Sequence, residues 1–330
     1  MKNTAFNRLR CRLLSHVTFG KMKQHYRKKY KESLARAEKY DAEKEMNALK
    51  SEVAQCVNPL KEDVAQCKDK LENIQNACRK FEYFYRVLFY APAVAQHHRE
   101  VFLPYKGVYK NKDIVICASG PTLNFYNRNL LKNAVHIGVN QAVLNKNVGC
   151  DYMFSIDFGG IQGKEKEILS TKCEKFFGIM RIPFLSDDNV MHVQFPVRFL
   201  QESGAKTFYV TDSNFFNPEI SEFPLSSHGS SVFPAIEFAL YTSPKRIYLA
   251  GADCGGGYFN SDKRYLNSHT IVDQYKYYKK EIERFYPDIE IVSVNPVGLK
   301  GLFHDVYTES YLNEHPEIDR NDVELLREGV

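Results

Sequence analysis

From residue 111 onward, short apolar runs rich in β-branched residues alternate with helical stretches. Helices are expected at 231–242 and 270–286, between the later runs. Strands are expected at 113–118, 134–139, 151–156, 175–180, 206–211, 245–250 and 289–294. This alternation predicts an α/β fold, a Rossmann-like and mostly parallel sheet with helices on both faces. A chain of 330 residues can bury such a core and still carry a further region.

The chain before this sheet has the composition of a helix. Residues 20–92 contain almost no glycine and are rich in lysine, glutamate and alanine. Apolar residues recur there at steps of three and four, with a local step of 11 residues, and form one seam. The seam consists of Met46, Leu49, Val53, Cys56, Leu60, Val64, Cys67, Leu71, Ile74, Cys78 and Phe81. Asn58 can cap and Pro59 can open a helix, so two helices are predicted, either as an antiparallel hairpin or as a coiled-coil contact in a homo-oligomer.

The sequence thus divides into a helical region at 1–104, a Rossmann-like catalytic domain at 105–310 and a polar, partly helical tail at 311–330. The chain has eight cysteines, and none of them form a CxxC pair or have the spacing of zinc ligands. This favours a reduced, cytoplasmic setting and no metal site. No stretch has the length of a membrane span, and the apolar residues near the N-terminus are too broken for a secretion signal.

Positive charge is concentrated at the N-terminus. Residues 1–40 contain 12 Lys or Arg and 2 Glu, most densely at 21–31. The base-stacking aromatics and motifs of nucleic-acid-binding proteins are not evident there, so no nucleic-acid partner is predicted. A basic helix can bind an anionic membrane surface, and a solvated helix face is the alternative.

The first expected strand ends in "CASGPTLN", which begins at Cys117. Small residues at a strand end, followed by a helix start, are typical of a phosphate or nucleotide site in α/β proteins. We therefore expect Ser119, Gly120, Pro121 and Thr122 to bind a nucleotide. The chain has no GxxxxGK[ST] motif and no GxGxxG motif, which argues against a P-loop and weakens a dinucleotide interpretation.

Further polar residues follow the other expected strands. Asn140 and Gln141 follow the second strand, and their amides can read a base or ribose; a helix cap and a solvated turn are the alternative roles. Asp157 and Asp253 follow later strands. The turn Gly229, Ser230 and Ser231 opens a helix whose first amides can hold an anion. These residues complete the predicted nucleotide site.

In this order and spacing, "ASGPTL", "GVNQ" and "GSSVFPAIEFALYTSPKRIYLAGAD" resemble the bacterial sialyltransferases of glycosyltransferase family 42. They also resemble the related domain of motility accessory factors and of a class of pterin pyrophosphokinases. The resemblance covers residues 110 to 300 and implies a GT-A-like variant of the Rossmann fold.

The resemblance also implies roles for individual residues. His269 would be the general base, with His228 as a second candidate, and Tyr258 and Tyr265 would contact the leaving phosphate. Ser119 stands where these sialyltransferases have an asparagine. The run Cys-Gly-Gly-Gly after Asp253 is a departure from their pattern.

The implied reaction is a metal-independent, inverting transfer of an acidic sugar from a CMP-activated donor to a surface glycan or glycoprotein acceptor. Such an enzyme would act in lipopolysaccharide, capsule or flagellin modification, in the cytoplasm or at the inner face of the inner membrane. One alternative is a Mg²⁺-dependent diphosphotransfer of the pterin pyrophosphokinase type, with Asp157 and Asp253 as the metal-binding carboxylates. Another is a non-catalytic assembly protein.

Overall fold

The computed structural model describes residues 20, 21, 23–25, 28, 42–179, 195–211, 216–255, 257–261, 268–323, 325 and 326. The chain forms two compact units, Met1–Tyr83 and Phe84–Val330. The second unit contains the sheet, and it also includes Val94 to Phe102, which the sequence analysis groups with the N-terminal helices. These residues belong to it because Val94, His98 and Phe102 are buried there.

The α/β unit contains one nine-stranded sheet in which every pairing is parallel. Its strands are β1 (Asp113–Cys117), β2 (Val135–Val139), β3 (Tyr152–Ser155), β4 (Glu174–Ile179), β5 (Lys206–Thr211), β6 (Leu225–Ser226), β7 (Arg246–Ala250), β8 (Glu290–Val294) and β9 (His304–Val306). Their order is β6-β5-β4-β3-β2-β1-β7-β8-β9. All seven predicted strands are confirmed; β6 and β9 were not predicted.

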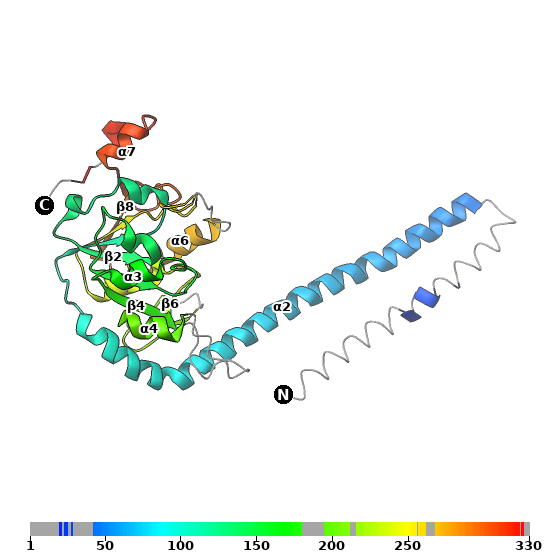
Figure 1. Ribbon diagram of the computed structural model, residues 1–330. Coiled ribbons are helices and arrows are strands. Elements are labelled where there is room, and N and C mark those ends of the chain that lie inside the picture. The colour runs from blue at the N-terminus through cyan, green and yellow to red at the C-terminus, as the bar shows by residue number, and fades with distance from the viewer. Residues whose placement is uncertain are drawn as a thin grey trace. The chain divides into compact units, whose positions relative to one another are not determined.

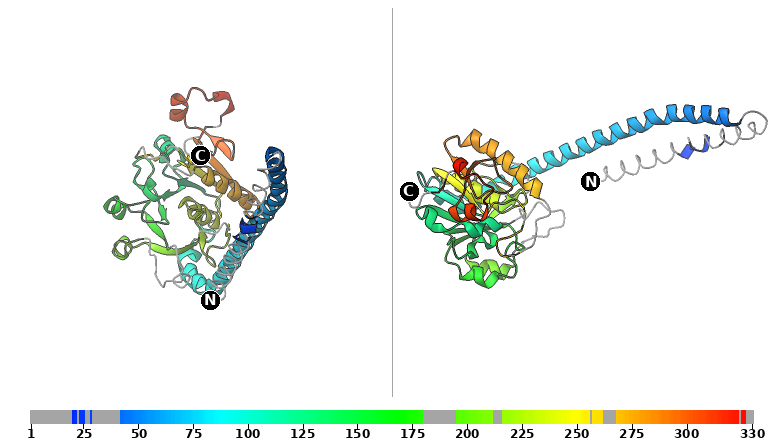
Figure 2. Two further views of the ribbon diagram at one scale, coloured as in Figure 1. Left: turned by 90° about the vertical axis from the view of Figure 1, so that its right-hand side faces the viewer. Right: turned by 90° about the horizontal axis from the view of Figure 1, so that it is seen from above.

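Helices cover both faces of the sheet, as the alternating pattern predicts. One face packs against α5 (Val232–Tyr241), α6 (Ser268–Phe285) and the end of α2 (Ala42–Phe102). The other packs against the short helices η2 (Pro121–Phe125), η3 (Arg128–Leu131), η4 (Asn140–Leu144), α3 (Glu165–Ser170) and α4 (Val197–Ser203). The remaining helices are η1 (Leu103–Tyr105), α7 (Glu309–Glu314) and η5 (Arg320–Asp322). Figures 1 and 2 show α7 projecting from one end of this unit.

The predicted break in the N-terminal helix is wrong. Residues Ala42–Phe102 form a single α-helix, α2, which continues through Asn58 and Pro59 (Figure 1). Pro59 cannot donate to the carbonyl of Gln55, so the helix lacks one backbone hydrogen bond there. The neighbouring lysine, glutamate and alanine residues are strong helix formers and favour helix on both sides.

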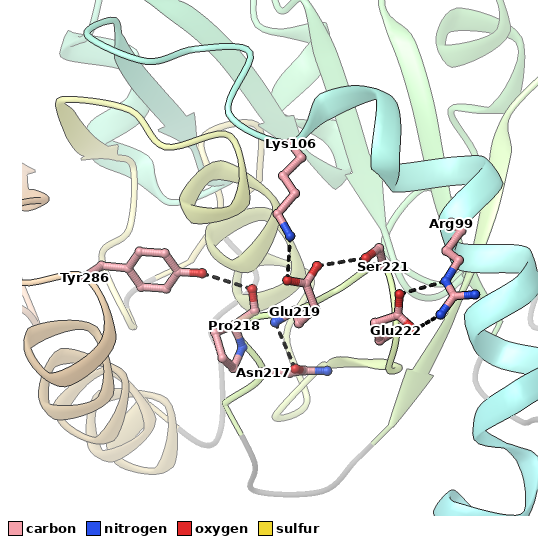
Figure 3. Close-up of polar contacts among 8 residues, drawn as sticks. All are labelled: Arg99, Lys106, Asn217, Pro218, Glu219, Ser221, Glu222 and Tyr286. Carbon is pink, nitrogen blue, oxygen red and sulfur yellow. Dashed lines mark hydrogen bonds and ion pairs between the residues drawn. The ribbon is translucent and has the colours of Figure 1, made fainter.

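The last turns of α2 are joined to the segment 217–222 that leads to β6 (Figure 3). Arg99 donates two hydrogen bonds to Glu222, at 2.7 and 2.6 Å. Lys106, just after η1, donates to Glu219 at 2.7 Å. Beneath these exposed pairs, the buried His98 ring accepts from the Tyr209 amide and donates to the Ile220 carbonyl, both at 2.8 Å. The ring therefore ties α2 to β5 and to the same segment.

Candidate functional site

A pocket lies at the carboxyl edge of the sheet, where the strand order reverses between β1 and β7. In open parallel sheets, this switch point is where ligands bind, since the loops on its two sides diverge. The pocket is lined by Ala118, Ser119, Gly120, Val139, Asn140, Ser230, Val232, Gly251, Ala252, Asp253, Cys254, Gly255, Gly257, Tyr258, Ile271 and Tyr275. These residues lie at or after the ends of β1, β2 and β7, or at the starts of α5 and α6.

Two glycines allow the ends of β1 and β7 to approach each other. The Gly120 amide donates to the Gly251 carbonyl at 2.8 Å. A Cβ on Gly120 would lie 2.5 Å from that same oxygen and would overlap the Asp253 carboxylate. Gly251 has a φ of +68°, and a Cβ there would overlap the Ala118 carbonyl. The close backbone contact that forms this wall therefore requires glycine at both positions.

Asp253 and Thr122 bind each other across this wall. The Thr122 amide donates to Asp253 Oδ2 at 2.8 Å, and the Thr122 hydroxyl donates to Oδ1. Burial raises the pKa of the Asp253 carboxyl, although the two hydrogen bonds from Thr122 oppose the rise. Both carboxylate oxygens thus hold the first turn of η2 in place behind Ser119 and Gly120.

Asn140 is held in the pocket by two serine hydroxyls. Ser155 and Ser231 donate to its Oδ1 at 2.8 and 3.0 Å. Its backbone is left-handed, with a φ of +53°, and a Cβ on Gly160 would lie 2.7 Å from its amide carbon. The Nδ2 group of Asn140 has no hydrogen bond within the described part of the chain. It is therefore the amide donor that is available to a ligand.

The start of α5 forms the opposite wall. Ser231 is its N-cap residue, and its hydroxyl also accepts from the Ile156 amide at 3.1 Å, so it joins the helix start to the end of β3. Ser230 lines the pocket, whereas Gly229 is exposed beside it and does not. The positive end of the helix dipole therefore points toward the pocket rim.

The glycine-rich segment after Asp253 is attached to this rim by three hydrogen bonds. The Phe259 amide donates to the Ser119 carbonyl at 2.9 Å, and the Asn124 amide group donates to the Phe259 carbonyl at 3.0 Å. Asn260 donates to Gln141 at 2.8 Å. Gln141 is thus placed beside the pocket and contacts this segment, and Tyr258 lines the pocket from within it.

The first turns of α6 close the pocket through Ile271 and Tyr275. His269 lies in the first turn of the same helix, two residues before Ile271, and its side chain is outside the described residues, as is all of Tyr265. Tyr275 is buried, with its ring centroid 5.1 Å from that of Phe233. Burial, together with Cys254 and Asp253, raises the pKa of Tyr275 well above its ordinary value. Its hydroxyl therefore stays protonated as a donor and has no hydrogen bond within the described residues.

Three further predicted residues, Pro121, Asp157 and His228, do not line the pocket. Pro121 opens η2. Asp157 accepts from the Gly160 amide at 2.7 Å. The buried ring of His228 packs 5.1 Å from Tyr278 and 5.4 Å from Phe233, on the side of α5 and α6 that forms the core.

Comparison with known proteins gives a likeness in structure alone. No family model and no curated protein matches the chain. It is similar to the sialyltransferase CstII from Campylobacter jejuni in complex with a substrate analogue, CMP-3FNeuAc, with a TM-score of 0.36 and 16% identity over 66% of this chain and 87% of that chain. A structure of CST-II with a trisaccharide acceptor and CMP has a TM-score of 0.34 and 15% identity over 55% of this chain and 80% of that chain.

A larger cavity, of about 860 Å³, lies at the opposite, amino edge of β1, β7, β8 and β9. Its charged residues pair with one another: Arg246 with Asp113 at 3.3 Å, and His304 with Glu290 at 3.1 Å. None of the predicted site residues lines it, so the carboxyl-edge pocket remains the candidate site.

The described residues contain no group of three or more His, Cys, Asp or Glu residues placed to hold a metal ion. None of the helices described is both long and apolar enough to cross a membrane.

Proposed function

We propose that this protein is a glycosyltransferase that moves an acidic sugar from a CMP-activated donor to a glycan or glycoprotein acceptor. The observation that carries the proposal is the meeting of Ser119, Asn140, Ser230 and Tyr258 around one pocket at the switch point. These residues come from the three sequence motifs that resemble the sialyltransferases of family 42, and from the segment that follows them. CstII, one protein to which the chain is similar in structure, was solved with CMP and with a substrate analogue, CMP-3FNeuAc.

The proposed reaction is a single displacement. An acceptor hydroxyl attacks the anomeric carbon, the bond from that carbon to the CMP phosphate breaks, and the phosphate leaves with the bonding electron pair. His269 takes the proton of the attacking hydroxyl, since a neutral imidazole titrates near operating pH. Tyr258, Tyr265 and the amides at the start of α5 would stabilise the charge that develops on the phosphate.

The Mg²⁺-dependent diphosphotransfer is the weaker candidate. It would need Asp157 and Asp253 as metal ligands. Asp253 accepts hydrogen bonds from Thr122 on both of its oxygens, and Asp157 accepts one from Gly160. A metal ion at these carboxylates would have to share them with their internal partners, and the described residues contain no group of three or more His, Cys, Asp or Glu residues placed to complete such a site.

The test is calorimetric titration of the full chain with CMP, CDP, UDP, GDP and ATP, each in EDTA and then in Mg²⁺. CMP binding in EDTA is expected. At a CMP concentration of 100 times the Kd, binding should raise the free energy of unfolding by about 2.7 kcal/mol. The His269→Ala variant should still bind CMP but lose transfer from CMP-activated acidic sugars. ATP binding that requires Mg²⁺ would favour diphosphotransfer instead, and the absence of any nucleotide binding would favour the assembly-protein alternative.

We further propose that the basic residues 1–40 hold the enzyme at an anionic membrane surface, where glycan acceptors are assembled. Attraction between exposed charges is screened within about 3 Å in 1 M salt. Washing membranes with molar salt should therefore release the protein, and retention would indicate a different anchor.

A further inference from the structure

Between Cys56 and Cys78, α2 carries an apolar stripe that is open to solvent, and Leu49 and Val53, which continue the stripe toward the start of the helix, are half-buried. Leu60, Val64, Leu71 and Ile74 are 45 to 60% exposed. The three thiols of the stripe, Cys56, Cys67 and Cys78, are exposed as well. A long helix in water is stabilised chiefly by packing of its apolar face against another element, so such a stripe indicates a contact surface.

The stripe is built from a repeated sequence. Residues 53–56 and 64–67 are both Val-Ala-Gln-Cys, and each is followed four residues later by leucine, at Leu60 and Leu71. A period of 11 residues over three turns is 3.67 residues per turn, close to the 3.6 of a straight helix. The Val, Cys and Leu positions therefore stay on one side of α2, whereas Gln55 and Gln66 lie on the other.

Charge decides between two possible occupants of the stripe. One is the N-terminal segment 1–40, which carries 12 basic and 2 acidic residues. The helical stretch 46–82 contains six basic and six acidic residues and offers it no acidic face. A second copy of this neutral stretch meets no net repulsion, and the repeat places identical apolar residues opposite each other.

We propose that this stripe is a dimer interface, in which α2 of one chain pairs with α2 of a second copy, parallel and in register. Val53 and Val64 then face their own counterparts, as do Cys56, Cys67, Leu60 and Leu71. The paired stretch from Val53 to Cys78 is about 38 Å long at 1.5 Å per residue. An antiparallel pair centred on Cys67 would instead place Asp63 against Leu71 and Lys70 against Val64. The interface is independent of the pocket and of the proposed reaction.

The first experiment measures the mass of the full chain in solution by sedimentation equilibrium at micromolar concentration. Wild type should have twice the chain mass of 38.2 kDa. The variant Leu60→Glu/Leu71→Glu should sediment as a single chain. The matched control, Gln55→Glu/Gln66→Glu, adds the same charge to the opposite side of the helix and should remain a dimer. A monomeric wild type, or a dimeric Leu60→Glu/Leu71→Glu variant, would overturn the proposal; circular dichroism and thermal unfolding check that each variant is folded.

The second experiment tests the orientation by mild oxidation. The variant Cys67→Ser/Cys78→Ser retains only Cys56 in the stripe and should form a disulfide-linked dimer on a non-reducing gel. Adding Cys56→Ser should abolish that dimer, which excludes a link through the other cysteines. A dimer in solution that does not cross-link through Cys56 would contradict the parallel, in-register arrangement.

Discussion

Tyr275 is a buried tyrosine whose hydroxyl borders the pocket without a protein hydrogen bond among the described residues. A buried tyrosine hydroxyl normally finds a partner, and a bound nucleotide would supply one. The variant Tyr275→Phe keeps the ring packing on Phe233 and removes only the donor. We expect it to weaken CMP binding by about 1 kcal/mol, roughly fivefold in Kd, with the melting temperature of the free protein little changed. Unaltered CMP affinity by calorimetry would exclude this contact.

Gly120 is the residue at which substitution should harm the site most. In Gly120→Ala the new methyl group meets the Gly251 carbonyl and the Asp253 carboxylate, and relief requires β1 and β7 to separate or the Thr122–Asp253 contact to break. We expect a loss of roughly 1–3 kcal/mol in the free energy of unfolding together with loss of CMP binding. Ser119→Ala, next in the chain, removes one hydrogen bond to the Val139 carbonyl and should cost only about 1 kcal/mol. Equal effects of the two changes in urea unfolding would refute the steric argument.

The sequence could identify the site residues whose position follows from chain order, but it could not identify contacts between loops. Ser119 and Asn140 follow parallel strands and Ser230 precedes a helix, so chain order alone places them at one edge of the sheet. The internal partners of Gln141 and Asp253 depend on which loops meet in space. Tyr275 shares helical spacing with the core residues Tyr278 and Ile282, and that pattern predicts burial instead of a ligand contact.

At the scale of elements, one imidazole holds the end of α2 on the sheet. Burial lowers the pKa of His98 to about 4, so the ring is neutral in the folded protein and takes up a proton on unfolding below its ordinary value of 6.5. The stability contributed by this ring is therefore complete above pH 6.5 and is lost as the pH falls toward 4, at up to about 1.4 kcal/mol per pH unit. His98→Gln should be less stable than wild type at pH 7 and should lose less stability between pH 6.5 and 5. Parallel pH dependences of wild type and variant in urea unfolding would contradict this.

The sequence predicts helix boundaries correctly where the apolar periodicity matches the face that the helix buries. Helices α5 and α6 lie within two residues of their predicted ends at 231–242 and 270–286. The expected interruption at Asn58 and Pro59 illustrates the opposite case, because cap and proline signals are also compatible with a helix interior when good helix formers flank them. Strands β6 and β9, of two and three residues, are too short to show any alternation.

For the molecule as a whole, one buried acid makes stability depend on pH above 4.5. Glu237 on α5 accepts hydrogen bonds from the Ser226 amide at 3.0 Å and the Tyr278 hydroxyl at 2.8 Å. Burial nevertheless raises its pKa to about 8. The folded protein keeps this proton while the unfolded chain releases it above pH 4.5, so the contribution of Glu237 to stability falls between pH 4.5 and 8 by up to about 1.4 kcal/mol per pH unit.

The matching variant is Glu237→Gln, which retains an oxygen acceptor and carries no titratable proton. Its stability relative to wild type should rise steadily from pH 6 to pH 8. A constant difference across that range, measured by urea unfolding at fixed ionic strength, would show that Glu237 is already ionised in the folded state.

The pairing of β1 with β7 joins residues 133 positions apart, from Asp113 to Arg246, and the pocket lies between their ends. During synthesis, a nascent chain that has not yet extended beyond Ala250 lacks one wall of the pocket, however well its first strands have folded. Ligand capture thus becomes possible only after β7 and the residues that follow it have been synthesised. A nucleotide in the surrounding solution would bind and stabilise only the protein in which β1 and β7 have paired. It would not change the rates of the folding steps that precede this pairing.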